Sequence, residues 1–329
     1  MTEAPSARFE FVRVERAADI PARDPLAVDV AVLDMNHGLP NVGHHAIVAL
    51  VREVAREQDE RLADSGRRVR VLSYAVRHRL MVPEHDGRHR LYLGTGGPGH
   101  LDPRRNREDR GEAEIREDPS WEAPLWRLFD AIVADESTAL YGVCHTFGLL
   151  CRWSGAAQPV LRGPGKGGKM SGVGIDVLTT DALAHPWFGR LREHLPDGKR
   201  APVLESRYYD LVPAGTLPLG ATAIAFEAAL DDAGTGDAMT MVEFARDRAT
   251  GLPRVFAVNN HPEIGAADRV SALLADLLAR GAMTPEVFAA RSAILPTLRE
   301  DRAEHRLLVA RTVLDDLVRA QIERILAGT

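Results

Sequence analysis

Three separated fragments of the chain carry the residue types that acyl transfer through a thioester requires. The first, Tyr141 to Gly148, places Cys144 where an apolar run meets a helical pattern. The second is His261-Pro262-Glu263, whose spacing places an imidazole and a carboxylate on one face of an extended segment. The third, Gly94 to Gly99, is a glycine-rich turn whose backbone N–H groups fit a developing oxyanion. Together they supply a nucleophile, a base, an orienting acid and an oxyanion cradle.

Cys144 is the candidate nucleophile. A strand pattern over 139–143 delivers it directly to a helical pattern over 145–153, and Gly142 and Gly148 leave room for a sharp turn. A thiol at a helix N-terminus has its thiolate stabilised by the exposed N–H groups. The alternative is a buried, inert cysteine, which is the commoner role of a lone Cys. The surrounding motif favours the catalytic role.

His261 and Glu263 are the candidate base and its orienter. They follow an apolar run that ends at Val258. A neutral imidazole beside a thiol takes its proton, and a carboxylate fixes the tautomer of that imidazole. The alternative is a polar turn in which Pro262 simply ends the strand. The cysteine turn elsewhere in the chain favours the catalytic pair.

Two glycine-rich segments mimic nucleotide motifs. Gly94 to Gly99 fits Gly-x-Gly-x-x-Gly, but Pro98 lies inside the required helix start, and no amphipathic helix follows. Residues 163–169 resemble a phosphate loop, but Met170 stands where Ser or Thr would bind magnesium. A flexible loop near the cleft is favoured there. The remaining histidines show no zinc spacing with a third ligand, so no metal site is predicted.

The elements that must position these fragments alternate along the first half of the chain. Strand-like apolar runs and helical spacing predict an α/β fold with a flavodoxin-like, mostly parallel sheet flanked by helices. Beyond residue 170 strand-like runs dominate, which predicts a mixed or antiparallel edge. The predicted strands are 28–33, 68–75, 90–94, 139–143, 172–178, 202–211, 222–227, 239–247 and 254–258, and the predicted helices are 42–62, 125–131, 145–153 and several within 269–326.

Three parts are expected along the chain: a charged, irregular N-terminal arm (1–26), a catalytic α/β domain (27–265) and a C-terminal helical extension (266–329). Thr284-Pro285 favours a helix start, with Thr as the cap and Pro in the first turn. The leucine spacing of the extension fits packing on its own domain or a homodimer interface, and the sequence leaves both open.

Composition limits the classes of function. The chain has 329 residues and 45% hydrophobic content, with no apolar run of membrane-spanning length and a polar start, so a cytoplasmic protein without membrane association is predicted. A net charge of −6 argues against a broad nucleic-acid surface. The only cysteines, Cys144 and Cys151, lie across a helix start, so no disulfide is expected and a reducing compartment fits.

Gly142-Val143-Cys144, Gly96-Gly97-Pro98 and His261-Pro262-Glu263 resemble the class I glutamine amidotransferase family, over roughly residues 28–265. The resemblance implies that Cys144 attacks the side-chain amide of glutamine. A γ-glutamyl thioester forms, ammonia leaves, and water then releases glutamate. His261 is then the base, Glu263 its orienter, and the backbone N–H groups of Gly97 and His145 form the oxyanion hole.

Gly96, Arg207 and Tyr208 are predicted to contact the substrate, with a structural ion pair as the alternative role for Arg207. The Gly and Gln that the family carries shortly after the cysteine are replaced here by Thr146 and Gly148. The expected partners are a small substrate, glutamine or a similar amino acid, and an acceptor or synthetase subunit. No cofactor is expected.

A second resemblance is to the homoserine O-acyltransferases, through Lys169 to Val173, Ser206 to Tyr208 and His305 to Leu308. It implies that Cys144 accepts an acyl group from acyl-CoA, as a co-substrate, and passes it to the hydroxyl of a small amino acid. A third hypothesis is a catalytically degenerate scaffold that binds a partner through its C-terminal helices.

Overall fold

In the described part of the chain, twelve strands form one sheet, in the order β1-β3-β2-β4-β5-β12-β11-β10-β7-β8, with β9 beside β11 and β6 beside β9. The computed structural model describes residues 8–39, 41–106, 115–163, 169–195, 197–229, 234–265, 267–279, 281, 284–292, 295–298 and 303–328. The strands are β1 (Phe9–Val14), β2 (Ala27–Asp34), β3 (Arg68–Ala75), β4 (Leu91–Gly94), β5 (Ala139–Val143), β6 (Ala157–Leu161), β7 (Met170–Leu178), β8 (Arg200–Arg207), β9 (Tyr209–Pro213), β10 (Thr222–Ala228), β11 (Thr235–Arg246) and β12 (Pro253–Val258).

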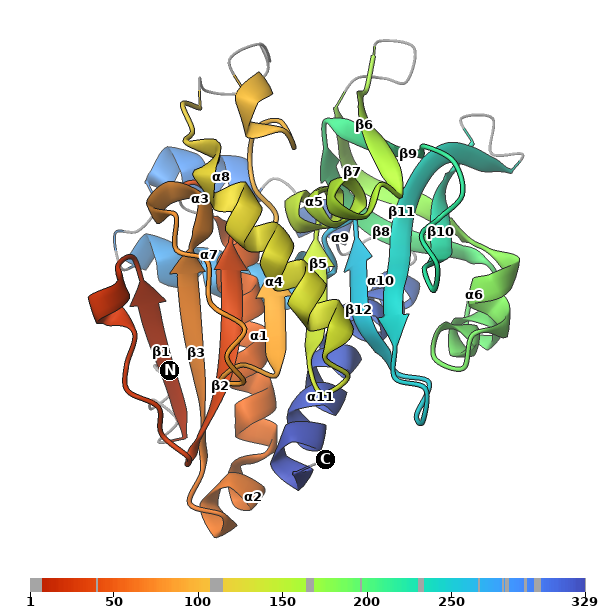
Figure 1. Cartoon of the computed structure of the whole chain (residues 1–329). Helices are drawn as coiled ribbons and strands as arrows, with labels where there is room; N and C mark the ends of the chain where they lie inside the picture. Colours follow the sequence, from red (N-terminus) through yellow and green to blue (C-terminus); the bar gives the residue numbers. More distant parts are fainter. Residues whose placement is uncertain are drawn as a thin grey trace.

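Helices cover both faces of this sheet (Figure 1). They are α1 (Val42–Glu57), α2 (Asp59–Asp64), α3 (Val76–Arg79), α4 (Glu122–Ala134), α5 (His145–Ser154), α6 (Thr180–Ala184), α7 (Ala267–Ala279), α8 (Pro285–Ser292), α9 (Leu295–Leu298), α10 (Ala303–Ala310) and α11 (Asp316–Ala327). The single helix predicted over 42–62 is divided at Gln58, which ends α1 and precedes α2. The helix start predicted at Pro285 is confirmed.

The parallel half of the sheet confirms the predicted α/β class. Strands β3, β2, β4, β5 and β12 are parallel neighbours, and their spatial order is the 2-1-3-4-5 order of flavodoxin-like folds. Parallel strands place their carboxyl ends at one edge, where ligands bind in open α/β sheets. The segments that follow β2, β4, β5 and β12, which include Asn36, Gly96, Cys144 and His261, therefore converge at that edge.

The second half is antiparallel, as the later strand-like runs predicted. Strands β12, β11, β10, β7 and β8 pair antiparallel in turn. The run predicted as one strand over 202–211 is two strands separated by Tyr208, because β8 pairs with β7 whereas β9 pairs with β6 and β11. Strand β6 was not predicted, since Pro159 interrupts its apolar pattern.

Two apolar clusters hold the three layers together. On one face Val30 of β2 packs in a cluster with Val54 of α1 and Leu317 of α11. On the other face Leu33 of β2 belongs to a cluster with Leu125 of α4. Alternate side chains of a strand reach opposite faces, so β2 contributes to both clusters. Among the residues described above, no helix is long and apolar enough to cross a membrane.

The end of the chain is part of this core. Helices α10 and α11 are joined by a π-helical turn, Arg311–Asp315, and form one continuous helical segment. Leu317, Val318 and Ile322 are fully buried against the sheet side that α1 also covers. Of the two arrangements left open for the extension, the structure shows packing on its own domain.

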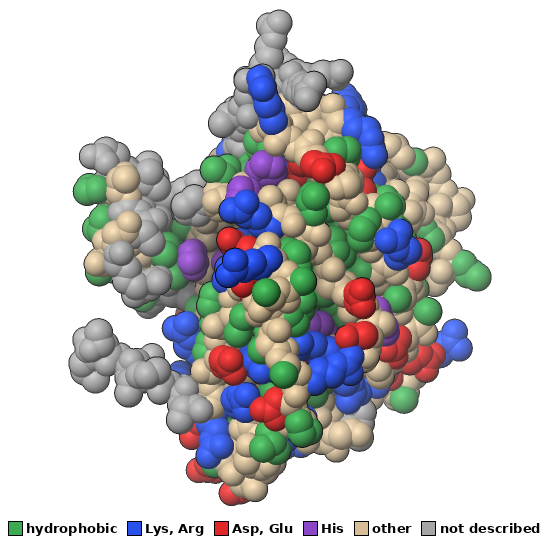
Figure 2. All heavy atoms as spheres, turned by 60° about the vertical axis from the view of Figure 1, so that its left-hand side comes forward, with side chains coloured by type: hydrophobic (Ala, Val, Ile, Leu, Met, Phe, Trp, Pro, Cys, Tyr) green, Lys and Arg blue, Asp and Glu red, His purple; other side chains and the backbone are tan. Residues whose placement is uncertain are grey.

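The N-terminal arm is not irregular throughout. Phe9–Val14 forms β1, which pairs parallel to β3 at the edge of the sheet. The charged residues of β1 obscured its strand pattern in the sequence. In the folded protein they find partners on the neighbouring strand, as Glu10 does in its 3.1 Å ion pair with Arg68 of β3. Figure 2 shows basic and acidic side chains interspersed on the side of the molecule that carries β1. Charges of this kind protect an edge strand from pairing with another chain.

Candidate active site

Cys144 occupies a strained turn between β5 and α5. Its φ of 49° and ψ of −99° lie in a region of backbone angles that residues other than glycine rarely adopt. Its N–H donates to the carbonyl of Val258 at 2.7 Å, which ties the turn to the end of β12. Such strain persists only where the surroundings impose it. The sequence prediction of a sharp strand-to-helix turn with the sulfur at its tip is confirmed.

The glycines around this turn make room for specific side chains. A Cβ on Gly142 would lie 2.9 Å from Cγ2 of Thr146, and a Cβ on Gly94 would lie 2.3 Å from the same atom. A Cβ on Gly148 would lie 2.4 Å from the side chain of Leu101. Leu101 therefore fills the space that a side chain at position 148 would need.

His261 and Glu263 form a hydrogen-bonded pair at the end of β12. Nδ1 of His261 lies 2.8 Å from Oε1 of Glu263, whose side chain is fully buried. The two were expected on one face of an extended segment. Instead a short 3-10 turn, Pro262–Ile264, bends the carboxylate back to the imidazole. A Cβ on Gly43, in the first turn of α1, would lie 2.6 Å from Glu263 Oε1, so that helix start packs directly on the carboxylate.

The imidazole of His261 is electrostatically coupled to both neighbours. Burial disfavours its charged form, but the charges of Glu263 and Cys144, with hydrogen bonds to both, outweigh burial and hold the pKa of His261 well above its usual range. Because Nδ1 is engaged by Glu263, Nε2 is the nitrogen left for the sulfur. The structure therefore brings the predicted nucleophile, base and orienter together.

The glycine turn packs beside Cys144 and His261. The hydroxyl of Thr95 donates to the carbonyl of Gly96 at 2.8 Å. In a trans peptide the C=O and N–H point in opposite directions, so the N–H of Gly97 is turned away from Thr95. A Cβ on Gly96 would lie 3.2 Å from Cε1 of His261 and 3.5 Å from Cβ of Cys144. The turn therefore lies directly against the reacting pair.

His145 contributes to the same wall. As the first residue of α5, it has a backbone N–H without an intrahelical partner. Its side chain is buried and hydrogen bonded to the backbone of Gly97. Burial, together with the charges of Arg77 and Arg152, keeps the pKa of His145 well below its usual range. The ring is therefore neutral.

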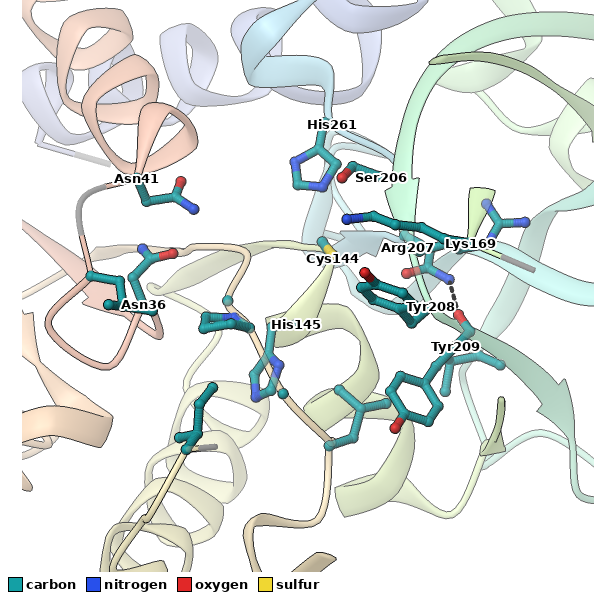
Figure 3. Close-up of a pocket in the computed structure, with 18 residues that line it drawn as sticks. Asn36, Asn41, Cys144, His145, Lys169, Ser206, Arg207, Tyr208, Tyr209 and His261 are labelled. Atoms are coloured by element: carbon teal, nitrogen blue, oxygen red, sulfur yellow. Dashed lines mark hydrogen bonds between the residues drawn. The ribbon is translucent and has the colours of Figure 1, made fainter. Parts of the chain in front are cut away.

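A pocket of about 370 Å³ opens at these residues (Figure 3). It is lined by Asn36, Leu39, Asn41, Gly97, Pro98, Gly99, Leu101, Ile115, Cys144, His145, Lys169, Ser206, Arg207, Tyr208, Tyr209, Leu211, Asn259 and His261. One wall comes from the carboxyl ends of the parallel strands, and the opposite wall comes from the junction of β8 and β9. The pocket therefore lies between the two halves of the sheet.

The two predicted substrate contacts differ in their surroundings. Arg207 lines the pocket, but its guanidinium is 2% exposed and forms ion pairs with Glu205, Asp210 and Glu227. Burial lowers the pKa of Arg207, but Glu205 and Glu227 outweigh burial and hold that pKa above the usual range. These ion pairs match the structural role that the sequence analysis gave as the alternative for Arg207. Tyr208 faces the cavity, and the ammonium of Lys169 lies 4.4 Å from its ring centroid.

Sequence reasoning missed several residues of the lining. Asn36 and Asn41 come from the connection after β2, and Asn259 comes from the end of β12. The rule that ligands bind at the carboxyl ends of parallel strands points to these positions. Of the predicted loop 163–169, residues 164–168 lie outside the described residues, whereas Lys169 lines the pocket. Within the described ranges, no group of three or more His, Cys, Asp or Glu side chains is arranged to hold a metal ion.

No protein-family model matches the chain, and no curated protein matches it in sequence. Among solved structures, it is similar to SMU.1228c, with 17% identity over 88% of this chain and 98% of that one, at a TM-score of 0.45. It is also similar to a glutamine amidotransferase from Thermotoga maritima, with 15% identity over 90% and 98% of the two chains (TM-score 0.45). The glutaminase domain of CTPS from Trypanosoma brucei, with bound acivicin, is 12% identical over 81% and 94% (TM-score 0.45). None of these likenesses assigns a reaction to this chain.

Proposed function

We propose that this protein transfers an acyl group through a thioester on Cys144, with His261 as base and Glu263 as its orienter. One observation carries the proposal. A cysteine held in a strained turn lies beside an imidazole whose other nitrogen is bonded to a buried carboxylate, and the cysteine and the imidazole line one pocket. This is the arrangement of an activated nucleophile, recognised by geometry and by role.

The first half-reaction follows from these positions. His261 Nε2 holds the proton of the Cys144 thiol, and the sulfur attacks the carbonyl carbon of an amide. The resulting oxyanion accepts hydrogen bonds from the N–H groups of Gly97 and His145. The C–N bond then breaks, and His261 returns its proton to the leaving nitrogen. With glutamine as the amide, ammonia leaves and a γ-glutamyl thioester remains on Cys144.

The second half-reaction repeats the pattern with water. His261 accepts a proton from a water molecule, whose oxygen attacks the thioester carbon. The C–S bond breaks, glutamate leaves, and the sulfur recovers its proton from His261. The net reaction is glutamine plus water giving glutamate plus ammonia. In an amidotransferase the ammonia passes to an acceptor enzyme, so a partner subunit belongs to this proposal.

One observation favours a second candidate, acyl transfer from acyl-CoA to a small amino-acid hydroxyl. Leu101 fills the space beside Gly148, where the amidotransferase resemblance would have a glutamine side chain. Leu101, Ile115 and Leu211 give the pocket an apolar side that fits a hydrocarbon acyl chain. In this reaction the sulfur of Cys144 attacks the thioester carbon of acyl-CoA, and CoA is the leaving group.

Two assays separate the candidates. The protein is incubated with glutamine while glutamate is measured, and with acetyl-CoA or succinyl-CoA, with homoserine as acceptor, while free CoA is measured. Glutamate release that Cys144→Ala abolishes supports the first candidate, and CoA release that the same variant abolishes supports the second. If neither substrate yields a Cys144-dependent product, both reactions are rejected and the scaffold hypothesis gains.

A further inference from the structure

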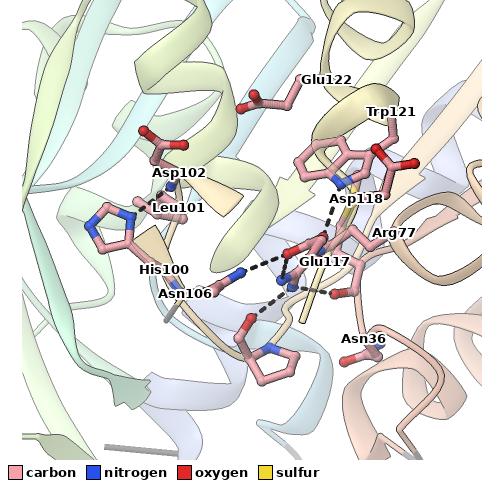
Figure 4. Close-up of polar contacts among 12 residues, drawn as sticks. Asn36, Arg77, His100, Leu101, Asp102, Asn106, Glu117, Asp118, Trp121 and Glu122 are labelled. Atoms are coloured by element: carbon pink, nitrogen blue, oxygen red, sulfur yellow. Dashed lines mark hydrogen bonds and ion pairs between the residues drawn. The ribbon is translucent and has the colours of Figure 1, made fainter. Parts of the chain in front are cut away.

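A buried ion pair lies behind the glycine turn (Figure 4). Arg77, in the short helix α3 after β3, forms a two-pronged contact with Glu117, from Nε to Oε1 at 2.5 Å and from Nη2 to Oε2 at 2.7 Å. Both side chains are 0% exposed. Neither residue touches Cys144 or lines the pocket. The triad and its oxyanion donors therefore leave the role of this pair unexplained.

Glu117 is bonded on both of its oxygens. Beyond Arg77, Oε1 accepts from Nε1 of Trp121 at 2.9 Å, and Oε2 accepts from Nδ2 of Asn106 at 2.7 Å. A buried carboxylate with this many donors stays rigidly placed. Asn106 also accepts from the N–H of His100 through Oδ1, at 2.5 Å, which ties the same network to the end of the glycine turn.

The other edge of the guanidinium faces the turn itself. Nη1 of Arg77 donates to the carbonyls of Met35 at 2.8 Å and of Pro98 at 2.7 Å. Met35 follows β2 and Pro98 follows β4, so one nitrogen joins the glycine turn to the neighbouring strand end. A Cβ on Gly97 would lie 2.3 Å from the Met35 carbonyl oxygen and 3.1 Å from Arg77 Nη1. The turn is therefore pressed against these two groups without spare room.

The carbonyls of the turn are bonded in sequence, and their partners set its orientation. Thr146 donates its hydroxyl to the carbonyl of Thr95 at 2.8 Å, and Thr95 donates to Gly96 at 2.8 Å. Arg77 supplies the bond to Pro98, the first residue after Gly97. Of these three donors Arg77 is the one cation, and its guanidinium is in turn held by Glu117.

We propose that Arg77, held by Glu117, is a positioning residue that sets where the N–H of Gly97 meets the oxyanion. The inference rests on the proposed acyl-transfer function and deepens it. Loss of the bond to Pro98 frees the turn to move away from Met35. A displacement of about 1 Å in a catalytic group costs roughly a hundredfold in rate. The effect is confined to reactions in which a carbonyl oxygen gains charge.

Two reactions at the same sulfur isolate this effect. Iodoacetamide forms a C–S bond at a saturated carbon as iodide leaves, so no oxyanion develops. The reaction with p-nitrophenyl acetate passes through a tetrahedral oxyanion. The C–O bond then breaks, p-nitrophenolate departs, and an acetyl thioester remains on Cys144. The ratio of the acylation rate to the alkylation rate therefore reports the oxyanion hole. The rates of Cys144→Ala are subtracted, which removes any reaction at the buried Cys151.

Two variants loosen the pair in different ways. Arg77→Lys keeps the charge but cannot bridge Glu117 and both carbonyls. Glu117→Gln keeps the size of the side chain but removes the charge that holds the guanidinium. In each, we expect the acylation-to-alkylation ratio to fall by about 10- to 100-fold, since loss of an oxyanion donor costs about 10²- to 10³-fold. The alkylation rate should change by less than about threefold, because the thiolate and His261 are untouched.

Arg70→Lys is the matched control. Arg70 forms an equally buried, two-pronged pair with Asp29, at 2.6 and 2.9 Å, within the β2–β3 ladder. This variant should lower Tm and leave the ratio unchanged. If the ratio falls equally in Arg70→Lys, or stays constant in Arg77→Lys and Glu117→Gln, the positioning role is refuted.

Other outcomes are also decisive. If the unchanged protein is alkylated but never acylated at Cys144, the proposed function fails and this inference fails with it. If Arg77→Lys does not fold, Glu117→Gln carries the test. Trp121→Phe, which removes a single donor from Glu117, gives the mildest version, with an expected fall in the ratio of a few fold. If neither Arg77→Lys nor Glu117→Gln folds, a ratio that stays constant in Trp121→Phe overturns the proposal.

Discussion

Gly97→Ala is the most direct test of where the oxyanion donor lies. A Cβ at this position would stand 2.3 Å from the carbonyl oxygen of Met35, whereas ordinary contact begins at 3.4 Å, so the turn must open by about 1.1 Å. The obstacle is backbone at the end of β2, which cannot rotate aside. A shift of this size in a catalytic group predicts a loss of roughly a hundredfold in acylation rate. The overpacking should also cost about 1–3 kcal/mol of stability.

The assay is the burst of p-nitrophenolate from p-nitrophenyl acetate, measured beside iodoacetamide alkylation and thermal unfolding. Gly97→Ala should lose acylation, keep alkylation and unfold at a lower temperature. Gly234→Ala is the control, because a Cβ there meets nothing within 4 Å. Acylation by Gly97→Ala within about threefold of the unchanged protein would refute the placement of the Gly97 N–H in the oxyanion hole.

Glu263→Gln should lower the pKa of His261. The pKa of His261 is about 6.5 in the unfolded chain and is raised in the folded protein. Charged His261 therefore stabilises the folded protein fully below about pH 6.5, and this stabilisation is lost as pH rises through the raised pKa. The fall in Tm on the alkaline side should consequently be smaller in Glu263→Gln than in the unchanged protein. An unchanged profile of Tm against pH would contradict the coupling. Tyr208→Ala should raise KM with little change in Tm, whereas Arg207→Met should destabilise by about 3–5 kcal/mol, because it leaves buried carboxylates unpaired. Equal effects of both variants on KM and Tm would disprove the separate roles. Leu317→Ala should cost about 2–5 kcal/mol in urea unfolding, since that side chain is fully buried, and a loss below about 0.5 kcal/mol would show that α11 is peripheral.

Much of the fold could be predicted because the determining signals are local. The bounds of β3 and β5 match the predicted ranges, since a run of apolar and β-branched residues specifies a buried strand wherever it lies. Patterns failed where a strand depends on its partner. The charges in β1 find their counterparts on β3, and Pro159 in β6 is tolerated opposite β9. Neither partner is visible in the local pattern.

The candidate site was predicted in the same uneven way. Cys144 and the His261-Pro262-Glu263 fragment stood out because a strand-to-helix cysteine and a neighbouring imidazole and carboxylate are short-range motifs. The turn that bends Glu263 back to His261 was not predicted, because it is set by packing against Gly43 of α1. Arg207 had two candidate roles, and only the carboxylates gathered around it from other strands give it the surroundings of an ion pair.

The sequence by itself determined which residues have the chemistry for acyl transfer and where most of the buried strands and helices lie, because residue type and short periodicity act between near neighbours. Only the tertiary structure decided how close those residues lie, that the glycine turn packs beside them, and that Arg77 and Glu117 meet behind that turn. These depend on contacts between segments distant along the chain. Their geometry follows from the packing of the whole sheet and its helices, and no local pattern encodes it.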